Sequence, residues 1–139
     1  MGNINYGRAI LGGLLCGLVL NIGEFLLNEV VFKQQMEEMF RRLSVPPPGS
    51  NFIAVAVVMT FLLGILIVLL YAMIRPRYGA GPKTAICAAL VIWFCVYIYC
   101  GVLNAAIFGI STSFLIIGMV WGLVEYALAA IAGAWLYRE

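Results

Sequence analysis

Four long apolar stretches constrain this chain more than any other feature of its sequence. They cover residues 9–32, 52–74, 84–108 and 114–137, and each is long enough as a helix to cross about 30 Å of hydrocarbon. Inside a bilayer every backbone N–H and C=O must be hydrogen-bonded within the protein, and none of the four stretches alternates like a strand of a membrane barrel. The sequence therefore predicts four membrane-spanning helices.

The composition supports a membrane protein with a single domain. Hydrophobic residues make up 65% of the 139 residues and charged residues 10%, against roughly 45–50% and about 25% in soluble domains. The spans leave little chain for a catalytic domain outside the bilayer. We therefore expect one transmembrane domain, residues 1–139, of the all-α class: an integral membrane four-helix bundle in contact with the lipid bilayer.

Several classes of function are disfavoured by the residues that are missing. The chain has eight Lys and Arg, six acidic residues that are all Glu, and no His, so it lacks both a nucleic-acid footprint and the commonest metal ligand. The four cysteines form no C-x-x-C pair and lie in apolar runs. We expect no nucleic-acid partner, no metal, no cofactor and no enzymatic activity.

Residues 33–43 predict an amphipathic helix that extends from the first span and either lies in the membrane interface or continues the span. Glu37 and Arg41, and likewise Glu38 and Arg42, are spaced for ion pairs on its polar face. Its apolar face is formed by Phe32, Met36, Met39, Phe40 and Leu43. We expect this helix to cover the mouth of the bundle; recognition of a lipid or a partner is the alternative.

The connections carry typical signals for helix ends. Prolines 46–48 end the amphipathic helix, and Ser50 or Asn51 is expected to cap the second span. Gly81 is expected to cap the third span, with Pro82 in its first turn. Gly109 ends this span, and Ser111 or Ser113 begins the fourth, which makes an antiparallel hairpin.

The basic residues predict the orientation, because cytoplasmic loops are enriched in Lys and Arg. If the N-terminus is inside, the inner side holds Arg8, Arg75, Arg77, Lys83 and Arg138. The outer side then holds Lys33, Arg41 and Arg42. This distribution favours cytoplasmic N- and C-termini.

Polar and small residues share one helical stripe in two of the spans. In the first span the stripe is formed by Gly13, Gly17, Asn21, Glu24 and Asn28. In the fourth it is formed by Gly118, Gly122, Glu125, Ala129 and Gly133. Small residues at this spacing allow helices to approach closely, so we expect Gly13, Gly17, Gly118, Gly122 and Gly133 to be helix-packing positions.

The two intramembrane glutamates are the main candidates for a functional site. Counted along the helices, Glu24, Asn21 and Glu125 lie at similar depth in the membrane. Asn28 follows Glu24 by one turn. Thr60 lies at a comparable depth, and Asn104 is nearer the outer surface. No basic residue lies deep in a span, so we expect at least one glutamate to be protonated at pH 7. The cluster either fixes helix register or binds an ion or substrate.

Three segments carry a resemblance to known proteins. They are residues 21–28 (NIGEFLLN), residues 75–85 (RPRYGAGPKTA) and residues 121–125 (WGLVE). The chain resembles, over nearly its whole length, a group of uncharacterised small bacterial four-span membrane proteins. The resemblance implies a multi-pass protein of the bacterial inner membrane and no assigned function. The chain is also similar to small multidrug transporters in its four spans and first-helix carboxylate, but Glu125 and the outer amphipathic segment depart from their pattern.

Two functions are consistent with these observations. The first is a packing, accessory or assembly component of the membrane, self-associating or bound within a larger complex, because the chain lacks catalytic groups and has glycine-rich helix faces. The second is a small proton- or cation-coupled transporter that acts as a homo-oligomer through its intramembrane glutamates.

Overall fold

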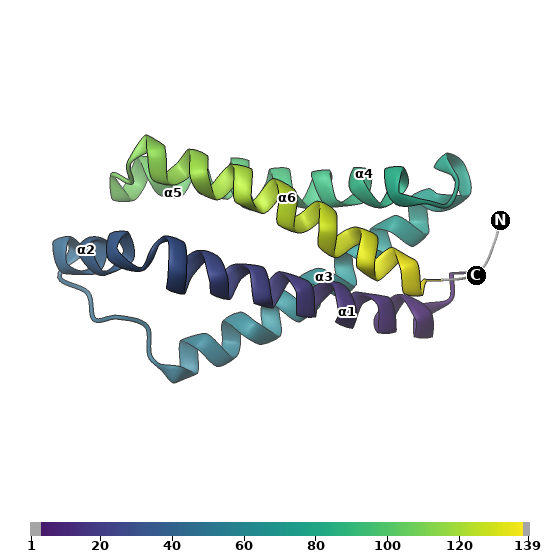
Figure 1. Ribbon diagram of the computed structural model, residues 1–139, viewed down its shortest axis with the longest axis horizontal. Coiled ribbons are helices and arrows are strands. Elements are labelled where there is room, and N and C mark those ends of the chain that lie inside the picture. The colour runs from purple at the N-terminus through teal and green to yellow at the C-terminus, as the bar shows by residue number, and fades with distance from the viewer. Residues whose placement is uncertain (1–3, 138–139) are drawn as a thin grey trace.

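The computed structural model describes residues 4–137, and this part of the chain folds into helices without a strand. The elements in chain order are α1 (Tyr6–Leu26), η1 (Leu27–Val31), α2 (Lys33–Leu43), α3 (Ser50–Tyr78), α4 (Pro82–Trp93), η2 (Phe94–Cys100), α5 (Gly101–Phe108) and α6 (Thr112–Leu136). The segments η1 and η2 are π-helical turns that continue α1 and α4 (Figure 1). The all-α prediction is therefore confirmed.

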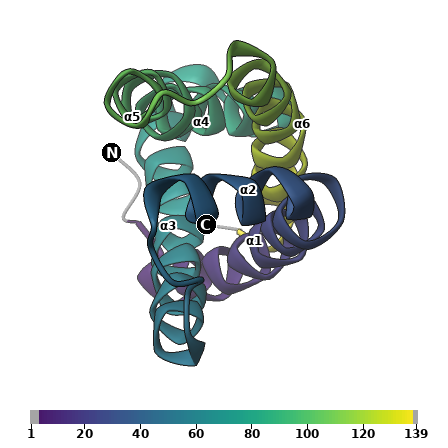
Figure 2. The ribbon, with the colours of Figure 1, turned by 90° about the vertical axis from the view of Figure 1, so that its left-hand side faces the viewer.

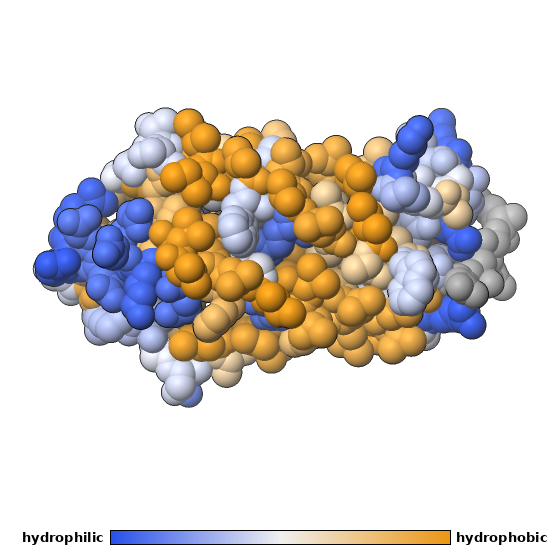
Figure 3. Space-filling model, viewed as in Figure 1, coloured by the Kyte–Doolittle hydropathy of each residue, from blue (hydrophilic) through white to orange (hydrophobic). Residues whose placement is uncertain are grey.

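Four continuous helices are long and apolar enough to cross a membrane. They run over Tyr6–Val31, Ser50–Tyr78, Pro82–Phe108 and Thr112–Leu136, so they include most of each predicted span. On the face drawn in Figure 3, an apolar band covers the middle of the molecule, and hydrophilic residues gather at the two ends. This distribution is the one expected of an integral membrane protein.

Glycines bring α1 into close contact with two neighbours. A Cβ added to Gly64 of α3 would lie 2.3 Å from the backbone nitrogen of Gly17, and one added to Gly12 would lie 2.5 Å from the carbonyl oxygen of Gly133 in α6. Only glycine permits these approaches, as is common between membrane helices. Gly17 and Gly133 thus serve helix packing as the sequence suggests.

The helix α3 begins outside the bundle and enters it where it crosses α1. The crossing lies at Gly64, where the two backbones meet, and the N-terminal half of α3 projects away from the other helices (Figures 1 and 2). Residues 50–55 are all exposed. Because α3 diverges, the side of α1 that carries Glu24 faces an internal space.

The predicted helix ends are mostly confirmed. Gly109 ends α5 in the left-handed conformation (φ 61°), and the side chain of Ser111 accepts a hydrogen bond from the backbone N–H of Phe114. Gly81 precedes α4, with Pro82 in its first turn. The expected cap of the second span is wrong: Ser50 is already helical and Gly49 takes the cap position, without a side chain to accept a hydrogen bond.

The helix α2 lies across one end of the bundle (Figure 2). The expected Glu38–Arg42 ion pair is not found among the described residues. Instead, the Arg42 guanidinium donates to the carbonyl oxygens of Phe108 at 2.7 Å and Gly109 at 3.2 Å. These carbonyls belong to the end of α5, where the helix dipole favours a positive charge.

Candidate ligand site

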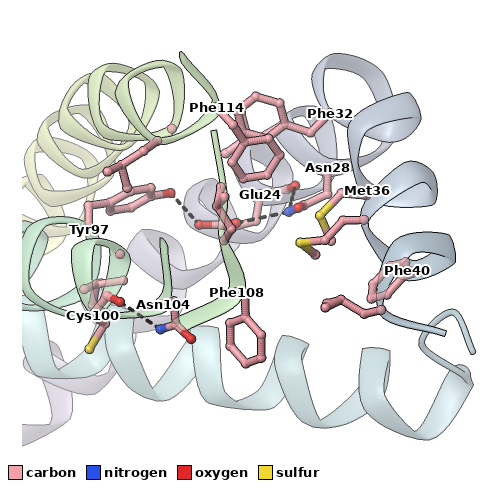
Figure 4. A pocket seen from close by; sticks show the side chains of 18 of the residues that line it. Glu24, Asn28, Phe32, Met36, Phe40, Tyr97, Cys100, Asn104, Phe108 and Phe114 are labelled. Atoms are coloured by element: carbon pink, nitrogen blue, oxygen red, sulfur yellow. Dashed lines mark hydrogen bonds between the residues drawn. The ribbon is translucent and has the colours of Figure 1, made fainter. Parts of the chain in front are cut away.

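A cavity of about 600 Å³ opens between α2 and the ends of the spans that surround it. Its walls are mainly aromatic, aliphatic and methionine side chains, contributed by α2, η2, α5 and α6. Four polar side chains also line it: Glu24, Asn28, Tyr97 and Asn104 (Figure 4). A largely apolar space with a few polar groups is typical of small-molecule sites.

The carboxyl group of Glu24 is held by one donor on each oxygen. The Tyr97 hydroxyl donates to Oε1 at 2.8 Å, and the Asn28 side-chain amide donates to Oε2 at 3.2 Å. The same amide also donates to the Glu24 backbone carbonyl at 2.8 Å. No Lys or Arg is among the described residues that line the cavity. Both donors are neutral, so they orient the carboxyl group and supply no positive charge to it.

Tyr97 reaches Glu24 because η2 and α6 hold its ring in place. A Cβ added to Gly122 would lie 2.3 to 2.7 Å from atoms of the Tyr97 ring, which therefore packs directly on the α6 backbone. The Tyr126 ring meets the Tyr97 ring edge-on, with centroids 5.5 Å apart. Gly122 was predicted to pack against a helix; it receives an aromatic ring instead.

Sequence reasoning missed Tyr97 as a site residue. A tyrosine in an apolar run has no distinctive spacing, and the π-helical turns that redirect the chain at η1 and η2 leave no periodic signal. Both turns contribute to the cavity wall, Asn28 from η1 and Tyr97 from η2. Single π-helical turns inside membrane-length helices are frequent at functional sites.

The opposite wall is aromatic and belongs to α2 and the start of α6. The rings of Phe32 and Phe114 stack with centroids 4.0 Å apart. All five residues of the predicted apolar face of α2 line the cavity, in agreement with the expectation that this helix covers the bundle mouth: Phe32, Met36, Met39, Phe40 and Leu43. Asn104 also lines it, while its amide donates to the carbonyl oxygen of Cys100 in its own helix at 2.8 Å.

Glu125 occupies a different place from Glu24. Its side chain is 6% exposed, its two carboxyl oxygens meet no hydrogen-bond geometry with a donor among residues 4–137, and it lies against Gly23, where an added Cβ would be 2.5 Å from its Cδ. It lines a second groove of about 620 Å³, walled by α1 and α6. Figure 3 shows a small hydrophilic patch in the apolar band over this seam. The two glutamates are neighbours that line separate spaces.

Two other predicted site residues lie away from the cavity. The Asn21 amide donates to the carbonyl oxygen of Gly17 at 2.8 Å and to that of Val57 in α3 at 3.4 Å. The Thr60 hydroxyl donates to the carbonyl oxygen of Ala56 at 2.8 Å. Asn21 and Glu24 share a helical stripe, but α3 covers only the first part of it before diverging. Asn21 therefore joins helices, whereas Glu24 faces the cavity.

The predicted packing glycines also fall into two groups, one at helix–helix contacts and one in the cavity wall. Cβ atoms added to Gly13 and Gly17 would lie 2.4 Å and 2.8 Å from the backbone of α3. Gly118 has ordinary space around it, with Phe32 at 3.8 Å and Tyr97 at 4.0 Å, and lines the cavity. The glycine stripe of α6 therefore packs on α1 near its C-terminal end and forms cavity wall near its N-terminal end.

Comparisons with known proteins add no assignment. The chain matches no protein-family model, no curated protein and no solved structure. The chemistry of the site therefore rests on its own geometry: an oriented carboxylate, two neutral donors and an apolar wall.

Proposed function

We propose that this chain is a non-enzymatic, multi-pass protein of the bacterial inner membrane that binds a small lipophilic cation in the cavity and carries it across the bilayer in exchange for protons. The observation that carries the proposal is the Glu24 carboxylate, which lines the cavity with a neutral donor on each oxygen. The inner-membrane location is taken from the resemblance of the sequence to small bacterial four-span proteins.

The charge of the ligand follows from the lining. A carboxylate in an apolar space needs a positive partner or a proton, since an isolated charge is costly there. The described lining supplies no basic side chain, so a cation or a proton must provide the compensation. Glu24 binds either one at a time, which is the requirement for coupled exchange.

The body of the ligand follows from the walls. Phe40, Phe108 and Phe114 offer aromatic faces that attract cations. Met36 and Met39 adapt to irregular shapes. A volume of about 600 Å³ accommodates a drug-sized molecule. An organic monocation with an aromatic or aliphatic body fits both properties.

Orientation and assembly are parts of the same proposal. The excess of basic residues on one side supports cytoplasmic N- and C-termini. With that orientation, α2 would lie on the outer side. The projecting half of α3 supports a homo-oligomer, in which this half packs on a second copy and helps to enclose a path.

Transport by reconstituted protein tests the proposal. In proteoliposomes with an imposed pH gradient, we expect uptake of tetraphenylphosphonium by the wild type and its loss in Glu24→Gln, which keeps the shape and removes the charge. Glu37→Gln is the matched control, because Glu37 lies on the exposed face of α2 and outside the cavity lining. Equal uptake by wild type and Glu24→Gln, or no uptake by either, would overturn the transport role.

The same projecting half of α3 also supports a second function. The exposed N-terminal half of α3 offers helix surface to another membrane protein, which favours an accessory or assembly component of a larger complex. Gentle purification from native membranes followed by native mass spectrometry distinguishes the two. Other subunits in fixed proportion would support the accessory role, whereas a homo-oligomer alone would argue against it.

A further inference from the structure

The helix α2 separates the cavity from the end of the bundle. Its apolar side chains form one wall of the cavity, while Lys33, Gln34, Gln35, Glu37 and Glu38 are all exposed. Figure 4 shows Met36 and Phe40 of α2 directed toward the space that contains Glu24. On this side, α2 therefore lies between the cavity and the end of the bundle.

Arg42 is the polar attachment between α2 and the opposite helices. Its Nη2 donates to the carbonyl oxygen of Phe108 and its Nη1 to that of Gly109, at the turn between α5 and α6. Hydrogen bonds from a charged donor are stronger than neutral ones. Arg41 precedes Arg42 on the same helix and makes no such contact in the described structure.

The rest of α2 is loosely attached. None of its residues is fully buried, which is typical of segments that open at low cost. Both of its ends are non-helical: Phe32 breaks the helix with φ −105° and ψ 6°, and Ser44 has a left-handed conformation with φ 54°. The chain after Ser44 contains Pro46, Pro47, Pro48 and Gly49. The helix can therefore move as a unit between two junctions.

We infer that α2 is a lid on the cavity and that Arg42 is its latch, so that breaking the contacts of Arg42 with Phe108 and Gly109 opens the ligand site to water at this membrane surface. This inference rests on the proposed function, because it assigns the aqueous access route to the same site. The N-terminal end of α2, held by the Phe32–Phe114 stack, stays in place as the hinge. The C-terminal end, held by Arg42, is the end that moves.

Thiol labelling measures the opening without any ligand. Leu27 lines the cavity and is 4% exposed, so Leu27→Cys reports access to the interior. The reagent is a positively charged, membrane-impermeant methanethiosulfonate, and mass mapping of the peptide that contains residue 27 gives the rate. The native Cys16 is 0% exposed and outside the cavity lining, so its labelling reports general unfolding.

We expect Arg42→Gln to raise the labelling rate at position 27 roughly tenfold, since two charge-assisted hydrogen bonds are lost and both are exposed, so that water replaces part of their energy. Arg41→Gln, with the same loss of charge, should leave the rate unchanged. Arg42→Lys keeps the charge but cannot make both hydrogen bonds in the same geometry, so its labelling rate at position 27 should lie between those of Arg41→Gln and Arg42→Gln. It also provides the comparison if Arg42→Gln fails to fold.

The outcomes separate this inference from the transport role. Equal rates at position 27 in the Leu27→Cys protein with Arg42 intact and in the same protein carrying either Arg42 substitution would overturn the lid, as would an increase at Cys16 that matches the increase at position 27. Faster labelling without any uptake of tetraphenylphosphonium would keep the lid and reject the transporter.

Discussion

At the scale of single residues, the site depends on how neighbours hold Glu24. The Tyr97 hydroxyl and the Asn28 amide occupy one position on each carboxyl oxygen. Such hydrogen bonds fix the direction of the carboxyl group and, when it is ionised, stabilise its charge. The sequence identified Glu24 and Asn28 by their shared stripe, but not Tyr97, because a contact between residues 73 positions apart depends on tertiary packing.

Removing the Tyr97 hydroxyl should weaken cation binding. In Tyr97→Phe the charge on Oε1 loses its donor, and a lost hydrogen bond to a charged group corresponds to roughly a tenfold change in affinity. Calorimetric titration with tetraphenylphosphonium measures the change. Tyr99→Phe is the control, since Tyr99 is exposed and does not line the cavity. Unchanged affinity in Tyr97→Phe would show that its hydroxyl has no part in binding.

Adding one methyl group behind Tyr97 should destabilise the protein. In Gly122→Ala the new Cβ would lie within 2.3 to 2.7 Å of the Tyr97 ring, and overpacking of this kind costs about 1–3 kcal/mol. Gly118→Ala has no contact shorter than 3.8 Å and should be tolerated. Thermal unfolding in detergent compares the two variants. Equal melting temperatures would contradict the placement of Tyr97 against α6.

At the level of helices, the sequence predicts where each span begins and ends better than it predicts which residues of other helices the span contacts. The apolar runs, Gly81–Pro82 and the Gly109–Ser111 turn are local signals, and the structure contains the corresponding helices and ends. The π-helical turns at η1 and η2 were not predicted, nor was the binding of Arg42 to α5. The Glu38–Arg42 pairing rule considers only one helix, whereas the free carbonyls at the end of α5 compete for the same guanidinium.

The turn between α5 and α6 should require glycine. Gly109 has φ 61°, a conformation that costs other L-residues roughly 1–2 kcal/mol, so Gly109→Ala should lower the unfolding temperature. Gly49→Ala is the comparison, because Gly49 has φ −81° and no atom within 4 Å of an added Cβ. If both variants unfolded at the same temperature, the left-handed turn would be refuted.

At the scale of the whole molecule, the crossing of α1 and α3 creates the internal space. Close contact at Gly64 fixes the crossing, and the divergence of α3 beyond it exposes the Glu24 stripe to the cavity. Sequence periodicity placed Asn21 and Glu24 on one face, but crossing angles depend on side chains from two helices together. This is why the polar cluster expected from the sequence divides into a packing part and a cavity part.

The central claim is that Glu24 makes the cavity selective for cations. Tetraphenylphosphonium and tetraphenylborate have nearly the same size and shape and opposite charge, so their binding to purified protein isolates the effect of charge. We predict that the wild type binds the cation at least tenfold more tightly than the anion, and that this preference disappears in Glu24→Gln and persists in Glu37→Gln. Equal affinities for the two ions in the wild type, or a preference that survives in Glu24→Gln, would contradict the claim.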